Sequence, residues 1–542
     1  MPAGPQVTVA VEPAAMVRPG DAVTIRVRGD VQTTALRLAI EGADTGWRNP
    51  AQLADGELFY TWIASEPDTY IITGQARNAD GGVSEQTHNL VVLPYAQPTL
   101  SGATRIVETK VTLPTYSLHA YLHPARDPAY NWPYLAFDRA AYEAAPPPIG
   151  PQRYRLVILE NDYLQVSFLP ELGGRLWQIL HKPSGDTMFY QNAVVKPSPW
   201  GPAQQLGWLA LGGLEWALPV NEHGYDWGTP WEFTTFQDET GTVGAVIATP
   251  NDGRLLSATI TVTLAADTAS VQVQPSLHNH AAHALDFHFW QTAMLAPGRG
   301  NHVGPELRFV IPARTMMVHS TGDPLLPGPE QRITWPRTFG RDLSRLGNWF
   351  RYLGLFEYPA AHGPFVGVYD PVLDAGAVRV FPAAVAQGSK LFGLGWRDPI
   401  GSDAYTDDGS TYVELHGGLS PSFFEPYRLA AGESVAWQET WYPIAGSGGL
   451  VTANDRVALG LRADSAGWTV GLYPTQPLTG TVVVRMGDAS PTRYAFTAAP
   501  DAPFVQGVPR AGAVAQPPDR PLRIQVLDAQ SHALLDYTAS RE

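Results

Sequence analysis

Apolar and polar residues alternate with a period of two along much of this chain, and this pattern limits the folds open to it. The clearest case is Ser257–Leu264, where every second residue is apolar, followed after a short turn by Ser270–Gln274. Such alternation is typical of a β-strand with one face on a core and the other in water. Helical periodicity is nearly absent, and residues 340–351 are the one candidate for a short helix. The sequence therefore predicts an all-β protein.

The length of 542 residues indicates more than one domain. Pro94–Pro98 and Gly446–Gly449 are linker signals. Between them lies more strand than a simple sandwich holds, which favours a supersandwich of two large stacked sheets with a cleft on one face. We expect four parts: an immunoglobulin- or fibronectin-like β-sandwich at 1–95, a linker and bridging segment at 96–152, the supersandwich at 153–445, and a small β-sandwich at 446–542.

Composition excludes several classes of function. The net charge is −15, with 36 basic and 51 acidic residues, and this balance disfavours nucleic-acid binding. The absence of Cys excludes disulfides, thiolate metal sites and Cys nucleophiles. No apolar run approaches the roughly 18 residues of a membrane span. Residues 1–5 lack signal-peptide features, so we expect either a cytoplasmic protein or one whose leader has been removed.

Metal binding is also disfavoured. Four histidines between His278 and His288 lack the spacing that places two ligands on one helix face. We predict neither a metal nor a cofactor.

One stretch, Gly212–Trp231, has the composition of a binding site. It holds three carboxylates, one imidazole and four aromatic rings within twenty residues. Rings that form walls, with a few polar groups that fix a ligand, suit a concave site. A charge at Glu215, between two apolar residues, needs a partner if it is buried. The candidate binding residues of the stretch are Glu215, Glu222, His223, Trp216, Trp227 and Trp231.

Three parts of the chain, in order, resemble the galactose mutarotase-like superfamily of aldose 1-epimerases and their relatives. The first is Asn161–Leu164 with Leu169–Leu176, which contains Gly-Gly-Arg; the second is Glu222–Tyr225 with the tryptophans after it. The third pairs Leu285–Trp290 with Tyr412–Gly418 and the turn at Leu429–Glu433.

A narrower resemblance covers about 105–445. Leu113–Tyr116, Leu169–Arg175, Val195–Pro197 and Gly212–Trp216 together resemble an uncharacterised bacterial domain family that is often fused to tetratricopeptide repeats.

The superfamily resemblance implies a sugar ligand and a set of roles. Glu414 would be the general base and His288 the general acid, while His223 and Arg175 would hold hydroxyl groups. Trp290 would join the other tryptophans in supplying apolar faces. The family's substrate-binding Asp segment is not identifiable here. The letters Leu415-His416-Gly417-Gly418 match a mutarotase motif but fall too late in the chain, so we treat them as coincidence.

Three functions are open on the sequence alone. The first is acid–base chemistry on a sugar, as in aldose 1-epimerisation, with Glu414 and His288. The second is glycoside hydrolysis, which needs two carboxylates and would use Glu414 with Glu215 or Glu222. The third is glycan binding without catalysis.

Overall fold

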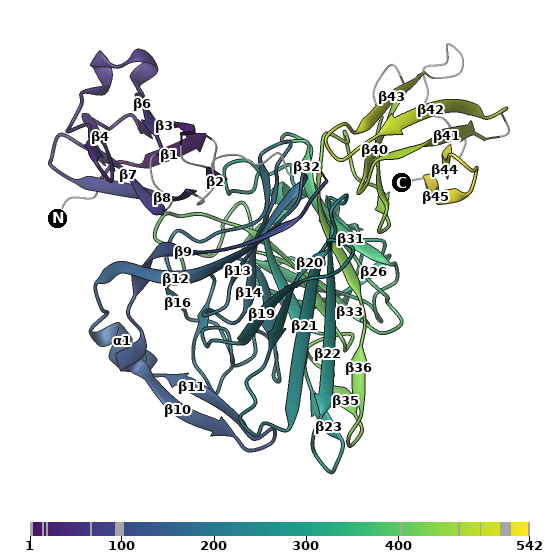
Figure 1. The fold of residues 1–542 in the computed structure, drawn as a ribbon, viewed down its shortest axis with the longest axis horizontal. Helices are drawn as coiled ribbons and strands as arrows, with labels where there is room; N and C mark the ends of the chain where they lie inside the picture. Colours follow the sequence, from purple (N-terminus) through teal and green to yellow (C-terminus); the bar gives the residue numbers. More distant parts are fainter. Residues whose placement is uncertain are drawn as a thin grey trace.

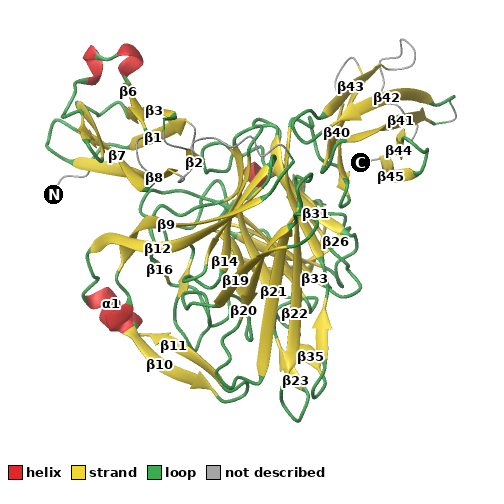
Figure 2. Cartoon of the chain, viewed as in Figure 1, coloured by secondary structure: helices red, strands yellow, loops and turns green. Residues whose placement is uncertain are grey.

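A computed structural model describes residues 4–12, 16–17, 20–64, 68–92, 102–401, 404–463, 467–487, 489–509 and 522–539. Strands and loops make up nearly all of the described chain (Figure 2). A large central unit carries a smaller unit at each upper corner, the N-terminal one in purple and the C-terminal one in yellow-green (Figure 1).

The central unit is built from two large sheets. In spatial order the first sheet holds β27 (Arg332–Thr334), β26 (Thr315–Thr321), β30 (Leu353–Glu357), β33 (Gly388–Gly393), β34 (Val413–Gly418), β24 (Trp290–Gly298), β15 (Asp186–Phe189), β14 (Arg175–His181), β13 (Leu164–Leu169), β12 (Ile149–Glu160) and β9 (Arg105–Tyr116), with β18 (Gly213–Ala217) paired to β14 and β24. The second holds β19 (Glu232–Gln237), β20 (Val243–Ala248), β21 (Leu256–Leu264), β22 (Val271–Asn279), β37 (Glu439–Ala445), β32 (Ala375–Val380), β31 (Phe365–Asp370) and β25 (Arg308–Val310), with β36 (Ser434–Ala436) beside β22.

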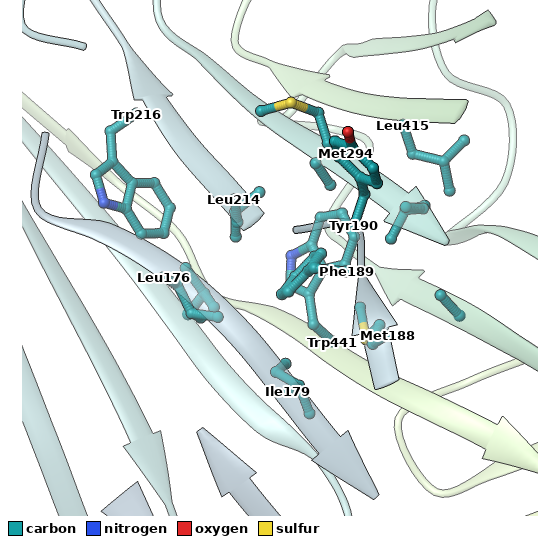
Figure 3. Packing of buried hydrophobic residues seen from close by; sticks show 14 of the residues in the cluster. Leu176, Ile179, Met188, Phe189, Tyr190, Leu214, Trp216, Met294, Leu415 and Trp441 are labelled. Atoms are coloured by element: carbon teal, nitrogen blue, oxygen red, sulfur yellow. The ribbon is translucent and has the colours of Figure 1, made fainter. Parts of the chain in front are cut away.

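The main core lies between these sheets. Its members include Leu176, Leu214 and Leu415 from the first sheet and Trp441 from the second, all fully buried. Figure 3 shows these side chains converging in one packed layer. The alternating stretch Ser257–Leu264 lies in β21, whose apolar residues face this core, and β21 pairs with β22 as predicted.

Each smaller unit is a pair of sheets with its own core. The N-terminal unit stacks β1 (Val7–Glu12), β3 (Ala22–Gly29) and β6 (Leu58–Ile63) with β2 (Met16–Val17), β8 (Val83–Val92), β7 (Thr69–Arg77), β4 (Ala35–Ile40) and β5 (Ala43–Asp44). The C-terminal unit stacks β38 (Thr452–Ala453), β39 (Val457–Ala463), β40 (Gly467–Pro474) and β43 (Phe504–Pro509) with β42 (Thr492–Ala498), β41 (Leu478–Met486), β44 (Leu522–Asp528) and β45 (Ala533–Ala539).

The segment at 96–152 is more than a bridge. Its strand β9 pairs with β12 along twelve residues at the edge of the first central sheet, and residue 153 falls inside β12. We therefore propose that the central unit begins near Arg105. The linker signal at Pro94–Pro98 lies outside the described residues.

Short elements complete the described chain. Two-stranded ribbons pair β10 (Leu122–Asp127) with β11 (Trp132–Phe137), β16 (Pro197–Ser198) with β17 (Trp208–Leu209), β23 (Leu285–Phe287) with β35 (Tyr427–Leu429), and β28 (Arg337–Thr338) with β29 (Arg341–Asp342). One α-helix, α1 (Arg139–Ala144), and the 3₁₀ turns η1 (Pro50–Gln52), η2 (Ala54–Gly56), η3 (His119–Tyr121) and η4 (Leu346–Asn348) are the helical elements among the described residues.

The candidate for a short helix at 340–351 forms no α-helix, and the 3₁₀ turn η4 is the helical part of that range. The Asp342 side chain accepts hydrogen bonds from the backbone and hydroxyl of Ser344, and such local bonds compete with helix formation. Within the described ranges, no helix is long and apolar enough to cross a membrane.

Candidate functional site

Two rows of side chains cross the first sheet on opposite faces. Leu214, Ala293, Leu415, Leu391 and Leu355 are neighbours on successive strands β18, β24, β34, β33 and β30, and all five are fully buried in the main core. Successive residues of a strand point to opposite faces. The next row, which we call the polar row, must therefore face away from the core. It consists of Glu215, Thr292, His416, Lys390 and Phe356.

The acidic group of the polar row, Glu215, has strong partners. It accepts hydrogen bonds from Trp208 Nε1 at 2.7 Å and from Arg175 Nη2 at 3.1 Å, both at Oε2. Arg175 also donates to the carbonyl of Gly212, so the arginine ties β14 to the start of β18. Glu215 and Arg175 are almost completely buried, and the expected need for a partner at Glu215 is met by this ion pair.

His223 lies against the same group. Its ring stacks on Trp208 with centroids 3.7 Å apart, and its Nδ1 lies 3.6 Å from Glu215 Oε1. Neither of these two atoms has a hydrogen-bond partner among the described residues. The loop can place His223 here because Gly224 follows it with φ +63; a Cβ there would lie 2.3 Å from the backbone nitrogen of Leu218.

Glu222, the residue before His223, reaches the other end of the row. Its Oε1 accepts a hydrogen bond from Lys390 Nζ at 2.6 Å and lies 3.9 Å from His319 Nδ1 of β26. Lys390 is buried against the ring of Phe423, 4.6 Å from its centroid. A loop carboxylate is thereby held over the middle of the sheet.

Glu414 shares its face of β34 with His416, two residues on. His416 Nε2 lies 2.7 Å from Glu414 Oε2, and His416 Nδ1 lies 3.2 Å from the hydroxyl of Thr292. With the hydroxyl donating to Nδ1, the imidazole donates its Nε2 proton to Glu414. Both ring nitrogens are thus engaged, and His416 orients the carboxyl group.

The two carboxyl groups Glu414 and Glu222 differ in protonation. Burial raises the pKa of Glu414, and the nearby charge of Lys390 offsets only part of this effect. Burial also acts against ionisation of Glu222, but the charge of Lys390 is the largest of the influences that bring its pKa below the usual range. At neutral pH Glu222 is therefore ionised, whereas Glu414 takes up a proton more readily than an ordinary glutamate.

Two of the histidines beside them, His319 and His416, are neutral at pH 7. Burial, reinforced by the charge of Lys390, lowers the pKa of His319 to about 4. The same two causes keep the pKa of His416 well below its usual value. These imidazoles therefore act as hydrogen-bonding groups rather than as cations.

The polar row reaches solvent at one end. The side chain of Glu222 is 34% exposed and that of His319 is 17% exposed. Beside them stands Phe424, 41% exposed, with its ring centroid 6.2 Å from His319 and 6.0 Å from Phe356. An open apolar ring next to buried polar groups suits an amphipathic ligand.

The structure places the predicted tryptophans away from this opening. Trp216 lies in the core, on the same face of β18 as Leu214 (Figure 3). It is on the face opposite Glu215 and donates its Nε1 hydrogen to the carbonyl of Gly174. Trp227 donates to Gln205, and Trp231 is packed in the same core. Trp290 lies on the polar face but is fully buried among Ala217, Phe356 and Phe423. The rings that border the polar groups are instead Trp208, Phe423 and Phe424.

His288 is the predicted residue that the structure does not bring to Glu414. It precedes β24, its backbone nitrogen donates to the carbonyl of Pro219, and its Nδ1 has no hydrogen-bond partner in the described part of the chain. Burial lowers the pKa of His288. The imidazole that contacts Glu414 is instead His416, which belongs to the Leu415–Gly418 motif.

Lys390, His319 and Trp208 were not found from the sequence. Nothing around Lys390 signals a site, except that it is one of four lysines in the chain. Its place follows only from the pairing of β33 with β34. Among the described residues, no group of three or more His, Asp or Glu side chains could hold a metal ion.

Comparison with known proteins places the chain in a family. Residues 126–444 match the domain of unknown function DUF5107, and the chain belongs to this family. The structure is similar to that of a TPR-domain containing protein from Parabacteroides distasonis, with 22% identity and a TM-score of 0.53 over 64% of this chain. The match spans 56% of the Parabacteroides chain, and it concerns the fold alone.

Weaker similarities extend to two further solved structures. A galactose mutarotase-like protein from Clostridium acetobutylicum matches 54% of this chain and 96% of its own, with 10% identity and a TM-score of 0.39. One from Lactobacillus casei matches 53% and 99%, with 9% identity and a TM-score of 0.34. The predicted fold class is confirmed: the chain is all-β, with a large two-sheet supersandwich flanked by two small β-sandwiches.

Proposed function

We propose that the central unit is a carbohydrate-active enzyme that performs acid–base chemistry on a sugar bound over the polar row. The observation that supports this most strongly is the pair Glu414 and Glu222, whose pKa values are moved in opposite directions. Two titratable groups separated in this way can serve as acid and base at one pH. The pair replaces the expected partnership of Glu414 with His288.

Aldose 1-epimerisation is the reaction that we place first. Glu222, ionised, takes the proton of the anomeric hydroxyl, while Glu414 delivers its proton to the ring oxygen. The bond between the anomeric carbon and the ring oxygen breaks as the carbonyl forms. After rotation about the adjacent C–C bond, the two transfers run in reverse and close the ring as the other anomer. Each carboxyl group then regains its starting protonation state.

Other groups of the site fit a sugar. Glu215 Oε1 and His223 Nδ1 are buried polar atoms that no described residue satisfies, and a hydroxyl group between them would satisfy both. Arg175 would hold Glu215 in place for this contact. Phe424 would cover the apolar face of a sugar ring at the solvent end.

Polarimetry on freshly dissolved α-anomers tests this proposal. We expect the wild-type protein to accelerate the change of optical rotation toward its equilibrium value. Glu414→Gln and Glu222→Gln should each lower this rate by at least about 100-fold. Glu239→Gln, in an exposed turn, is the matched control and should retain full activity. Wild-type activity that survives both site substitutions would contradict the assigned roles.

Glycoside hydrolysis is the second candidate. A second carboxylate on the same face, beside an exposed aromatic ring, suits a substrate of more than one sugar unit. Release of reducing ends from an oligosaccharide panel, abolished by Glu414→Gln and by Glu222→Gln, would favour hydrolysis over epimerisation. Binding of a glycan with no turnover in either assay would favour a binding protein that lacks catalysis.

A further inference from the structure

Lys390 is the cation of the polar row, next to its centre, and its charge acts on both proposed acid–base groups. It lies on β33 between Phe356 of β30 and His416 of β34, and its strand neighbour Phe392 faces Glu414. Its side chain is fully buried. A buried ammonium of this kind needs a countercharge, which Glu222 supplies at 2.6 Å.

The surroundings of Lys390 leave Glu222 little freedom. The ring of Phe423 lies under the ammonium, and the backbone carbonyl of Phe423 accepts a hydrogen bond from Asn221, the residue before Glu222. Titratable groups face Lys390 from every side of the site: Glu222 and His223 from the loop after β18, His319 from β26, and Glu414 and His416 from β34. Lys390 therefore acts on Glu222 through both its charge and a direct hydrogen bond, and on Glu414 through its charge.

We propose that Lys390 is the positioning residue of this site, whose buried ammonium fixes the Glu222 carboxylate over the sheet as its countercharge. The proposal rests on the function proposed above in naming Glu222 and Glu414 as the acid–base pair. Lys390 does not transfer a proton itself. It is the largest charged influence on both carboxyl groups and favours the ionised form of each.

Carboxyl ¹³C NMR of glutamate-labelled protein tests this directly, with Glu222→Gln to assign the resonance. In Lys390→Met, which keeps the length and apolar contacts of the chain, we expect the titration midpoint of Glu222 to rise by at least about one pH unit. Lys390→Arg keeps the charge and should retain a low midpoint. Lys196→Met removes a lysine paired with Asp407 outside the site and is the matched control. An unchanged Glu222 midpoint in Lys390→Met would overturn the proposal.

The small number of lysines gives a second measurement if Lys390→Met does not fold. Lysine-labelled protein shows resonances from four side chains, and Lys390→Arg identifies the one from Lys390. We expect the Lys390 resonance to shift with pH as Glu222 takes up a proton. This pH-dependent shift should be absent in Glu222→Gln. A Lys390 signal insensitive to Glu222 would again overturn the proposal.

Activity separates this inference from the proposed function. If sugar is turned over, the acid limb of the pH–rate profile should move to higher pH in Lys390→Met, since Glu222 must be ionised to act. If no sugar is turned over while the Glu222 midpoint still rises, the proposed function fails and the role of Lys390 stands. If sugar is turned over while the Glu222 midpoint does not move, the role of Lys390 fails and the proposed function stands.

Discussion

At the scale of single residues, the ion pair of Arg175 and Glu215 joins stability to the site. Both side chains are buried. One oxygen of the Glu215 carboxylate binds Arg175, and the other faces His223. Removing one member of a buried pair leaves the other charge without compensation.

We expect Glu215→Leu to lower the free energy of unfolding by roughly 3–5 kcal/mol, because Arg175 then remains buried without its partner. Denaturation by urea would measure this. The control is Asp407→Leu, which breaks the partly exposed pair with Lys196 and should cost at most about 1 kcal/mol. If the two substitutions lowered the free energy of unfolding equally, the buried pair of Arg175 and Glu215 would contribute no more to stability than the partly exposed pair.

Sequence patterns point to part of the candidate site and miss the rest for a physical reason. Glu215, Glu222 and His223 lie in one stretch whose composition marked it, and Glu414 was placed by resemblance. His416 carried a recognisable motif but was discounted because of its position in the chain. Lys390 gave no local signal, since its role depends on cross-strand pairing with a residue 26 positions away.

At the scale of strands, the close fit between β33, β34 and β24 depends on glycine. Gly418 and Gly388 lie directly under the ring of Trp290, where a Cβ would come within 2.4 Å of ring atoms. The tryptophan thereby lies flat on the sheet beside the polar row. Period-two alternation predicted strands such as β21 well, but it could not show that Trp216 faces the core while Glu215 faces the site.

Gly418→Ala should destabilise the protein by about 1–3 kcal/mol, because the added methyl group overpacks the Trp290 contact. Thermal unfolding would measure it. Gly507→Ala, on β43, is the matched control because a Cβ there meets no atom within 4 Å. A Gly418→Ala variant as stable as the control would contradict the packing described.

Glu357, the last residue of β30, makes the stability of the fold depend on pH. Burial raises the pKa of Glu357 to about 7. Between about pH 4.5 and 7, Glu357 holds its proton in the folded protein but has lost it in the unfolded chain. The free energy of unfolding therefore falls as the pH rises through this window.

In Glu357→Gln this dependence should disappear, with a gain of roughly 3 kcal/mol at pH 8 relative to the wild type. Urea unfolding at pH 5 and at pH 8 would show it as a smaller difference between the two conditions. A variant that loses stability equally at both pH values would indicate that Glu357 is ionised in the fold.

At the scale of the whole molecule, the two small units are attached differently. The core of the N-terminal unit is separate from the main core. The contacts between the N-terminal and central units include a hydrogen bond from the Thr69 hydroxyl to the Lys110 carbonyl and an exposed ion pair of Arg153 with Asp68. Tyr473 of the C-terminal unit belongs to the main core and stacks parallel to Tyr442.

Removal of residues 1–101 should therefore leave the melting temperature of the remainder nearly unchanged. Removal of residues 447–542 should lower it by more than about 5 °C, since it uncovers Tyr442 and its neighbours. Calorimetry of the two truncated chains would compare them. Equal effects would contradict the unequal attachment.

The central claim is that the polar row of the first sheet binds a sugar between Glu414 and Glu222. A crystal structure of the protein soaked with aldoses and short oligosaccharides tests it most directly. We expect a sugar ring whose oxygens lie within hydrogen-bond distance of both carboxyl groups, with Phe424 at its outer edge. Sugar bound only elsewhere on the molecule, with the polar row unchanged, would contradict it.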